Sequence, residues 1–155
     1  MSIKKENKEV EGILAFKIRD FLLRAGYEIK SFNPPGSQGG IILLDKYRGR
    51  GSIKPDVIAL KNKKVILVEV KPQFDQKDIE KLNRLNMNHI KDLFSKLGLP
   101  SSWITSYKKF LIKAICIKTN KKEIGRLPIP KDFIVFAYSK KIIIPYRENK
   151  ILDQI

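Results

Sequence analysis

Two aliphatic runs near the middle of the chain, residues 57–60 and 65–70, have the nearly continuous apolar character of buried β-strands. The turn-like segment 61–64, which reads Lys-Asn-Lys-Lys, separates them, so the pattern predicts a β-hairpin. If the turn is centred on the Asn-Lys pair of this segment, Leu60 pairs with Val65. The rest of the register follows from that pair.

Charged residues interrupt this aliphatic pattern at Asp56, Glu69 and Lys71. The predicted register puts Asp56 directly opposite Glu69, about 5 Å away, where like charges repel. Burying an unpaired carboxylate is costly, and a divalent cation would turn the repulsion into ligation, because hard cations take carboxylate oxygens. Side chains alternate along a strand, so Lys71 points the same way as Glu69. The three residues therefore predict a site for metal-assisted hydrolysis.

Helical periodicity predicts an amphipathic helix over residues 6–25, ended by Gly26, and a second helix from Asp75, as its cap, to about Leu97. Further strands are expected at 27–32, 41–44, 110–117, 133–138 and 142–146, with a polar loop at 101–109 in which Trp103 is an apolar anchor. This order predicts an α/β fold, a central mixed β-sheet flanked by helices, in a single domain spanning residues 1–155.

Glu11 lies on the apolar stripe of the first predicted helix, in phase with Leu14 and Ile18. Acidic residues rarely face a core without a partner, so Glu11 is a candidate for the same site. Glu9 is the competing acid, although its phase points more to the side. The alternative for Glu11 is a solvated first-turn position favoured by the helix dipole.

Composition favours a globular protein with a polyanionic partner. The 155 residues are 43% hydrophobic, and 32 Lys and Arg against 16 Asp and Glu give a net charge of +16. Such a charge favours nucleic acid, which releases counterions on binding. No stretch is long and apolar enough for a membrane span, and no secretory signal is visible. The single cysteine, Cys116, suits a core position in a reducing cytoplasm.

Residues 33–50 form a segment rich in Gly and Pro between two predicted strands, and a loop is expected there. Arg48 and Arg50 within it, and Lys54 after it, are candidates to contact DNA phosphates. The alternative is a flexible basic loop without specific contacts. The only histidine, His89, has no Cys or His partner in the sequence and is expected at the surface or facing a partner.

Pro55-Asp56 and Glu69-Val70-Lys71 resemble the two halves of the signature of the PD-(D/E)xK nuclease superfamily. The resemblance implies a restriction-endonuclease-like core in which Asp56, Glu69 and the main-chain carbonyl of Val70 bind Mg²⁺, with Mn²⁺ as the alternative ion. It assigns Lys71 to the attacking water.

Over about the first three quarters of the chain, the run 51–56 and the segment 87–98 resemble archaeal-type Holliday junction resolvases. That resemblance implies a homodimer acting on four-way junctions, a catalytic Glu11 that also binds metal, and a Ser52 that touches water at the metal or the scissile phosphate. The connection at 33–50 is longer than those nucleases usually have.

Three functions therefore remain open: a structure-specific endonuclease, a restriction-type or phage-type duplex endonuclease whose insertion reads a groove, and a non-catalytic DNA-binding subunit with a nuclease fold. The intact Asp56, Glu69 and Lys71 argue against the third.

Overall fold

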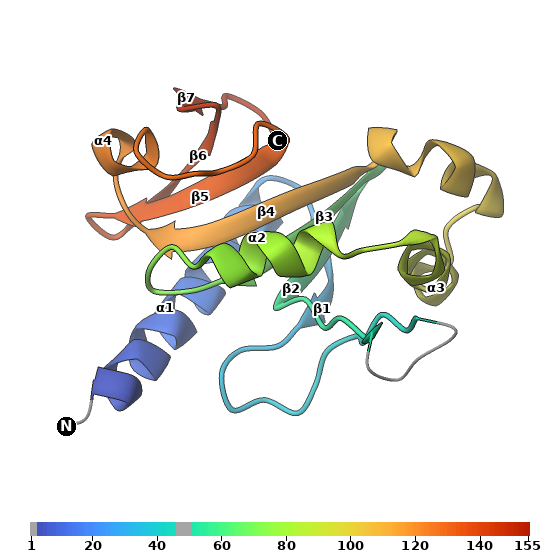
Figure 1. The fold of residues 1–155 in the computed structure, drawn as a ribbon, viewed down its shortest axis with the longest axis horizontal. Coiled ribbons are helices and arrows are strands. Elements are labelled where there is room, and N and C mark those ends of the chain that lie inside the picture. Colours follow the sequence, from blue (N-terminus) through green and yellow to red (C-terminus); the bar gives the residue numbers. More distant parts are fainter. Residues whose placement is uncertain (1–2, 46–50) are drawn as a thin grey trace.

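The computed structural model describes residues 3–45 and 51–155. In this part of the chain, a seven-stranded mixed sheet carries helices on both faces (Figure 1). The strands lie in sequence order: β1 (Glu28–Phe32), β2 (Val57–Lys61), β3 (Lys64–Val70), β4 (Leu111–Lys118), β5 (Phe133–Ser139), β6 (Ile142–Arg147) and β7 (Lys150–Ile151). The helices are α1 (Ile3–Arg24), α2 (Gln76–Asn83), α3 (Met87–Leu97), the 3₁₀ segment η2 (Ser101–Lys109) and α4 (Lys121–Ile124).

The sheet is mixed because its centre is parallel and its two sides are antiparallel. Strands β3, β4 and β5 run parallel, whereas β1–β2, β2–β3, β5–β6 and β6–β7 are antiparallel pairs. Parallel neighbours need a crossover, and the β3–β4 connection supplies one that contains α2, α3 and η2. The predicted α/β architecture, with a mixed sheet flanked by helices, is confirmed.

Two hydrophobic cores fill the two faces of the sheet, and α1 and α2 lie on opposite sides of it (Figure 1). On the α1 face, the fully buried Leu14, Ile18 and Leu22 pack in one cluster with Val57 and Val68. On the other face, α2 and α3 contribute a second cluster, made with alternate residues of the same strands. This alternation leaves Glu69 on the α2 side, in line with Val65 and Leu67.

The single helix predicted from Asp75 to Leu97 is wrong: the segment forms two helices. Asp75 does cap α2, since its side chain accepts a hydrogen bond from Lys77 N at 2.9 Å. Asn86 starts α3, because its side-chain oxygen accepts from the main-chain nitrogens of Asn88 and His89. Asn competes with the helical backbone in this way and so favours a helix start over a helix interior.

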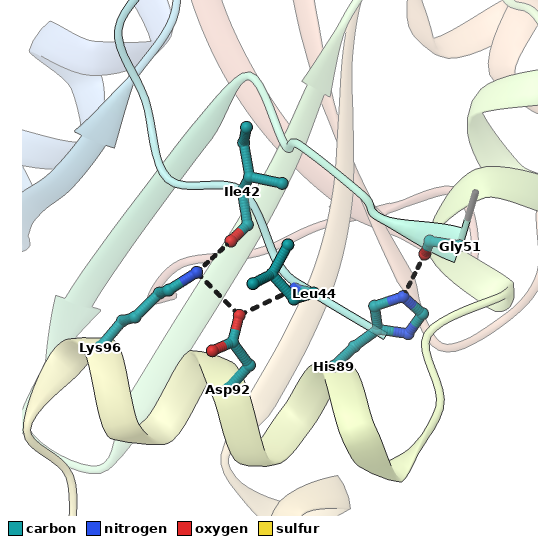
Figure 2. A network of polar contacts seen from close by, with 6 residues as sticks. All are labelled: Ile42, Leu44, Gly51, His89, Asp92 and Lys96. Carbon is teal, nitrogen blue, oxygen red and sulfur yellow. Dashed lines mark hydrogen bonds and ion pairs between the residues drawn. The ribbon is translucent and has the colours of Figure 1, made fainter. Parts of the chain in front are cut away.

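The surface position predicted for His89 is also wrong, because its side chain is only 2% exposed. Its Nδ1 accepts a hydrogen bond from Asn86 N at 3.0 Å, which completes a capping box. Because Nδ1 acts as acceptor there, Nε2 carries the proton and donates to the carbonyl of Gly51 (Figure 2). The histidine therefore joins the start of α3 to the segment that leads into Asp56.

The described part of the 33–50 insertion is fastened along α3 and does not form the strand predicted at 41–44. Only Leu43 pairs there, in an isolated bridge with Ile53. Asp92 accepts a hydrogen bond from Leu44 N at 2.8 Å, and Lys96 donates one to the carbonyl of Ile42 at 2.6 Å. Figure 2 shows both contacts running from α3 to the insertion. These contacts satisfy main-chain groups that a strand would have paired with a neighbour.

The predicted loop at 101–109 is instead the 3₁₀ segment η2, and Trp103 within it stacks on Phe110 at 5.0 Å between ring centroids, as the expected anchor. Cys116 is fully buried in β4, as expected. Among residues 3–45 and 51–155, none of the helices combines the length and apolar character needed to cross a membrane.

Candidate functional site

The β2–β3 hairpin brings Asp56 and Glu69 together in the predicted register. Leu60 pairs with Val65 and Val57 pairs with Val68, so Asp56, one residue before β2, lies opposite Glu69. Hydrogen bonds hold both the main-chain carbonyl and the side chain of Asp56. Its carbonyl accepts a hydrogen bond from Asn33 N at 2.8 Å, and its side-chain Oδ2 accepts one from Val70 N at 2.7 Å.

Glu69 is a carboxyl group in an unfavourable position for a charge. It is 2% exposed, and burial, followed by the negative charge of Asp56 and a side-chain hydrogen bond with it, raises the pKa of Glu69 to about 9. The nearby ammonium of Lys81 acts in the opposite direction but does not compensate. Extra positive charge at this point would therefore stabilise the ionised pair.

Lys71 follows β3 directly, and its main-chain nitrogen donates to the carbonyl of Cys116 at 3.0 Å. Burial lowers the pKa of its side chain, but the negative charges of Asp78, Glu11 and Asp56 outweigh burial and leave the pKa raised. Lys71 is thus kept as a cation beside the acids. That state suits charge stabilisation and orientation of a nucleophile rather than proton abstraction.

Glu11 reaches the same region from α1. It is partly buried, whereas Glu9 is exposed, so the choice of Glu11 as the inward acid is confirmed. Burial raises its pKa, the charge of Lys71 lowers it and the charge of Asp56 raises it, which places Glu11 within electrostatic range of both. Its role as a metal ligand stays a prediction.

Two site residues on α2, Asp78 and Lys81, were missed by sequence reasoning. The Nζ of Lys81 lies 2.5 Å from Glu69 Oε1 and donates to the carbonyl of Lys54 at 2.9 Å. Asp78 is 6% exposed, and burial raises its pKa to about 6 against the opposing charge of Lys71. Their i, i+3 spacing puts Asp78 and Lys81 on one face of the helix, next to the buried Ile79, and this was the signal available in the sequence.

Four predicted residues remain, two in the segment before β2 and two outside the described residues. Ser52 is exposed, and Lys54 is partly buried, with its carbonyl bonded to Lys81. Arg48 and Arg50 lie outside the described residues.

A metal site here would use few protein ligands. The described residues hold no group of three or more His, Cys, Asp or Glu side chains that could bind a metal ion. Mg²⁺ often takes only one or two carboxylates and keeps several waters, so the pair Asp56 and Glu69 fits that donor set. Burial and the charge of Asp56 both raise the pKa of Glu69, so a bound cation would stabilise its ionised form.

A cavity of about 680 Å³ lies at the opposite end of the sheet, where the parallel strands β3, β4 and β5 begin. Its lining includes Lys64, Lys108, Lys109, Lys113 and Arg147. It is therefore separate from the acids.

No protein-family model, curated protein or solved structure matches this chain.

Proposed function

We propose that this protein is a Mg²⁺-dependent endonuclease that hydrolyses phosphodiester bonds of DNA, in the manner of the PD-(D/E)xK nucleases. The observation that carries the proposal is the placement of Asp56 opposite Glu69 at the end of a buried hairpin, with the cationic Lys71 two residues after Glu69. A purely structural hairpin has no need of two acids there, since ionised buried carboxylates are costly.

Asp56 and Glu69 would hold the ion, with the Val70 carbonyl as a further oxygen ligand. Bound Mg²⁺ would activate water and offset the charge of the scissile phosphate. Lys71 would orient the nucleophile and stabilise negative charge in the transition state, and Glu11 would keep the Lys71 ammonium directed into the site. Ser52, which is exposed and shortly precedes Asp56 in the chain, would contact metal-bound water or the scissile phosphate.

The net charge of +16 supports DNA as the substrate, and the resemblance to resolvases favours four-way junctions. Symmetric cutting of a junction needs two active sites, which implies a C2 homodimer. The exposed apolar side chains of Ile13, Phe16 and Leu23 on α1 offer a surface for such a contact.

A second candidate, a DNA-binding subunit without nuclease activity, is favoured by one observation. Glu69 is already paired with an internal cation, the ammonium of Lys81. Such a pair could replace metal permanently.

Electrophoretic mobility of a four-way junction and a linear duplex of equal length, in EDTA, tests the DNA specificity without cleavage. Preferential binding of the junction by a dimer, with the dimer verified by sedimentation, is the expected result. Equal affinity for the two DNAs, or sequence-specific binding of the duplex, would instead support the restriction-type or phage-type endonuclease. A protein that binds neither DNA would contradict the proposal.

A further inference from the structure

Lys81 occupies the place beside Glu69 where positive charge is required. One ammonium group contacts two hard oxygen atoms, Glu69 Oε1 at 2.5 Å and the Lys54 carbonyl at 2.9 Å. Carboxylate and carbonyl oxygens are also the atoms that a divalent cation prefers. The lysine therefore uses ligands of the kind that the proposed metal ion would need.

We propose that Lys81 is a built-in counter-cation of the Asp56–Glu69 pair, and that a divalent ion binds there in competition with its ammonium group. This inference rests on the proposed function. It adds a residue outside the nuclease signature, Lys81, that lowers the affinity of the site for a divalent ion.

The position of Lys81 on α2 makes such an exchange feasible. The helix itself is fixed by the buried Ile79 and Leu82, which flank Lys81 on the sheet side. The Lys81 side chain remains 28% exposed, so its end can turn towards solvent without displacing the helix. Its flexible four-carbon stem carries a strongly hydrated charge, which lowers the cost of leaving the site.

The competition has a defined direction. A divalent ion at Glu69 and an ammonium at the same oxygen repel each other, so the ion must displace Lys81 or bind more weakly beside it. Removing the charge at position 81 should therefore strengthen divalent binding. A lysine that served only to position Glu69 would have the opposite effect, because its loss would disorder a ligand.

Calorimetric titration of Ca²⁺ into metal-stripped protein, without DNA, tests the inference with a readout that does not depend on cleavage. Lys81→Met removes the charge and keeps the length of the side chain. Lys81→Arg keeps the charge and serves as a folded comparison. Lys77→Met, at an exposed position of the same helix, controls for a general loss of positive charge. Glu69→Gln verifies that the titrated site is the one described.

We expect Lys81→Met to bind Ca²⁺ at least about tenfold more tightly than wild type, with Lys81→Arg and Lys77→Met within about threefold of wild type. Calcium should also raise the melting temperature of Lys81→Met more than that of wild type, because ligand binding stabilises the folded state.

If wild type binds Ca²⁺ through Glu69 and Lys81→Met binds it equally or more weakly, the inference is overturned. The proposed nuclease site would still stand in that case. If Ca²⁺, Mg²⁺ and Mn²⁺ bind to neither wild type nor Lys81→Met, the metal-dependent function itself fails, and this inference with it.

Discussion

Asp56 accepts a 2.7 Å hydrogen bond from the main-chain nitrogen of Val70, so a proposed metal ligand also fastens the end of β3 next to Glu69. Val70 is 1% exposed, and water cannot readily replace this acceptor. The same carboxyl group therefore has a structural role and a proposed chemical one, which two substitutions can separate.

Asp56→Ala should lower the free energy of unfolding by about 1–3 kcal/mol, because it leaves a buried N–H without an acceptor. Asp56→Asn retains a side-chain oxygen that can accept from Val70 and should cost less. Both should lose cleavage, because neither supplies the second carboxylate. Urea denaturation in EDTA measures the stabilities, and equal stability of the two variants would show that the Val70 hydrogen bond contributes little.

Stability of the metal-free protein should fall as pH rises, because the pKa of Glu69 is raised from its ordinary 4.5 to about 9. Between these values the folded protein holds a proton that the unfolded chain has lost, so the free energy of unfolding decreases with pH. Glu69→Gln should flatten that dependence. Urea denaturation at pH 5 and pH 8 in EDTA compares the two proteins, and identical pH dependence would contradict the assigned shift.

Loss of the proton from Glu69 should also favour divalent ions, because carboxylates bind metal when ionised. Calcium affinity of wild type is thus expected to rise from pH 6 towards pH 9. A calcium affinity that stays constant over this interval would indicate that Glu69 is already ionised or is not a ligand.

The contacts of His89 with Asn86 and Gly51 should hold the insertion against α3. His89→Ala should destabilise the protein by about 1–3 kcal/mol and raise protease sensitivity within the described residues 33–45, since it removes a buried side chain and its two hydrogen bonds. Lys91→Ala, at an exposed position of the same helix, is the control. A His89→Ala variant that resists urea and protease as wild type does would contradict this role.

DNA binding should weaken steeply with added salt, because phosphate contacts release counterions. Arg48→Ala with Arg50→Ala should reduce the slope of log K against log salt by about one to two units if both residues meet phosphates. Lys108→Ala with Lys109→Ala, beside the cavity at the opposite end of the sheet, is the matched comparison. An unchanged slope in the arginine double variant would exclude those two residues from the DNA interface.

The register of the central hairpin was predictable because a short turn leaves few ways to pair two aliphatic strands. Asn62 supplies the turn with a φ of 52°, a conformation that Asn adopts more readily than most residues. Pairing of Leu60 with Val65 then brings Asp56 to Glu69. Local chemistry thus specified the part of the site that lies on one hairpin.

The contributions of α2 and α3 could not be derived in the same way. Helical phase gives the direction of a Cβ, but not where the long side chain of Lys81 ends. The docking of the insertion depends on contacts from His89, Asp92 and Lys96 to main-chain groups of Gly51, Leu44 and Ile42, which have no side-chain signature in the sequence. The capping pair Asn86 and His89 was the one local signal available for the break between the helices.

Cleavage of a four-way junction, a linear duplex and single-stranded DNA, with Mg²⁺ or EDTA, by wild type and Glu69→Gln tests the proposed function most directly. Glutamine adds no negative charge that could weaken attraction to phosphates, so the variant should bind DNA in EDTA at least as well as wild type. We predict Mg²⁺-dependent, paired symmetric nicks in the junction by wild type, and none by Glu69→Gln. Metal-independent cleavage, equal cleavage by the two proteins, or DNA binding without any cleavage by wild type would contradict the assignment of a metal-dependent nuclease.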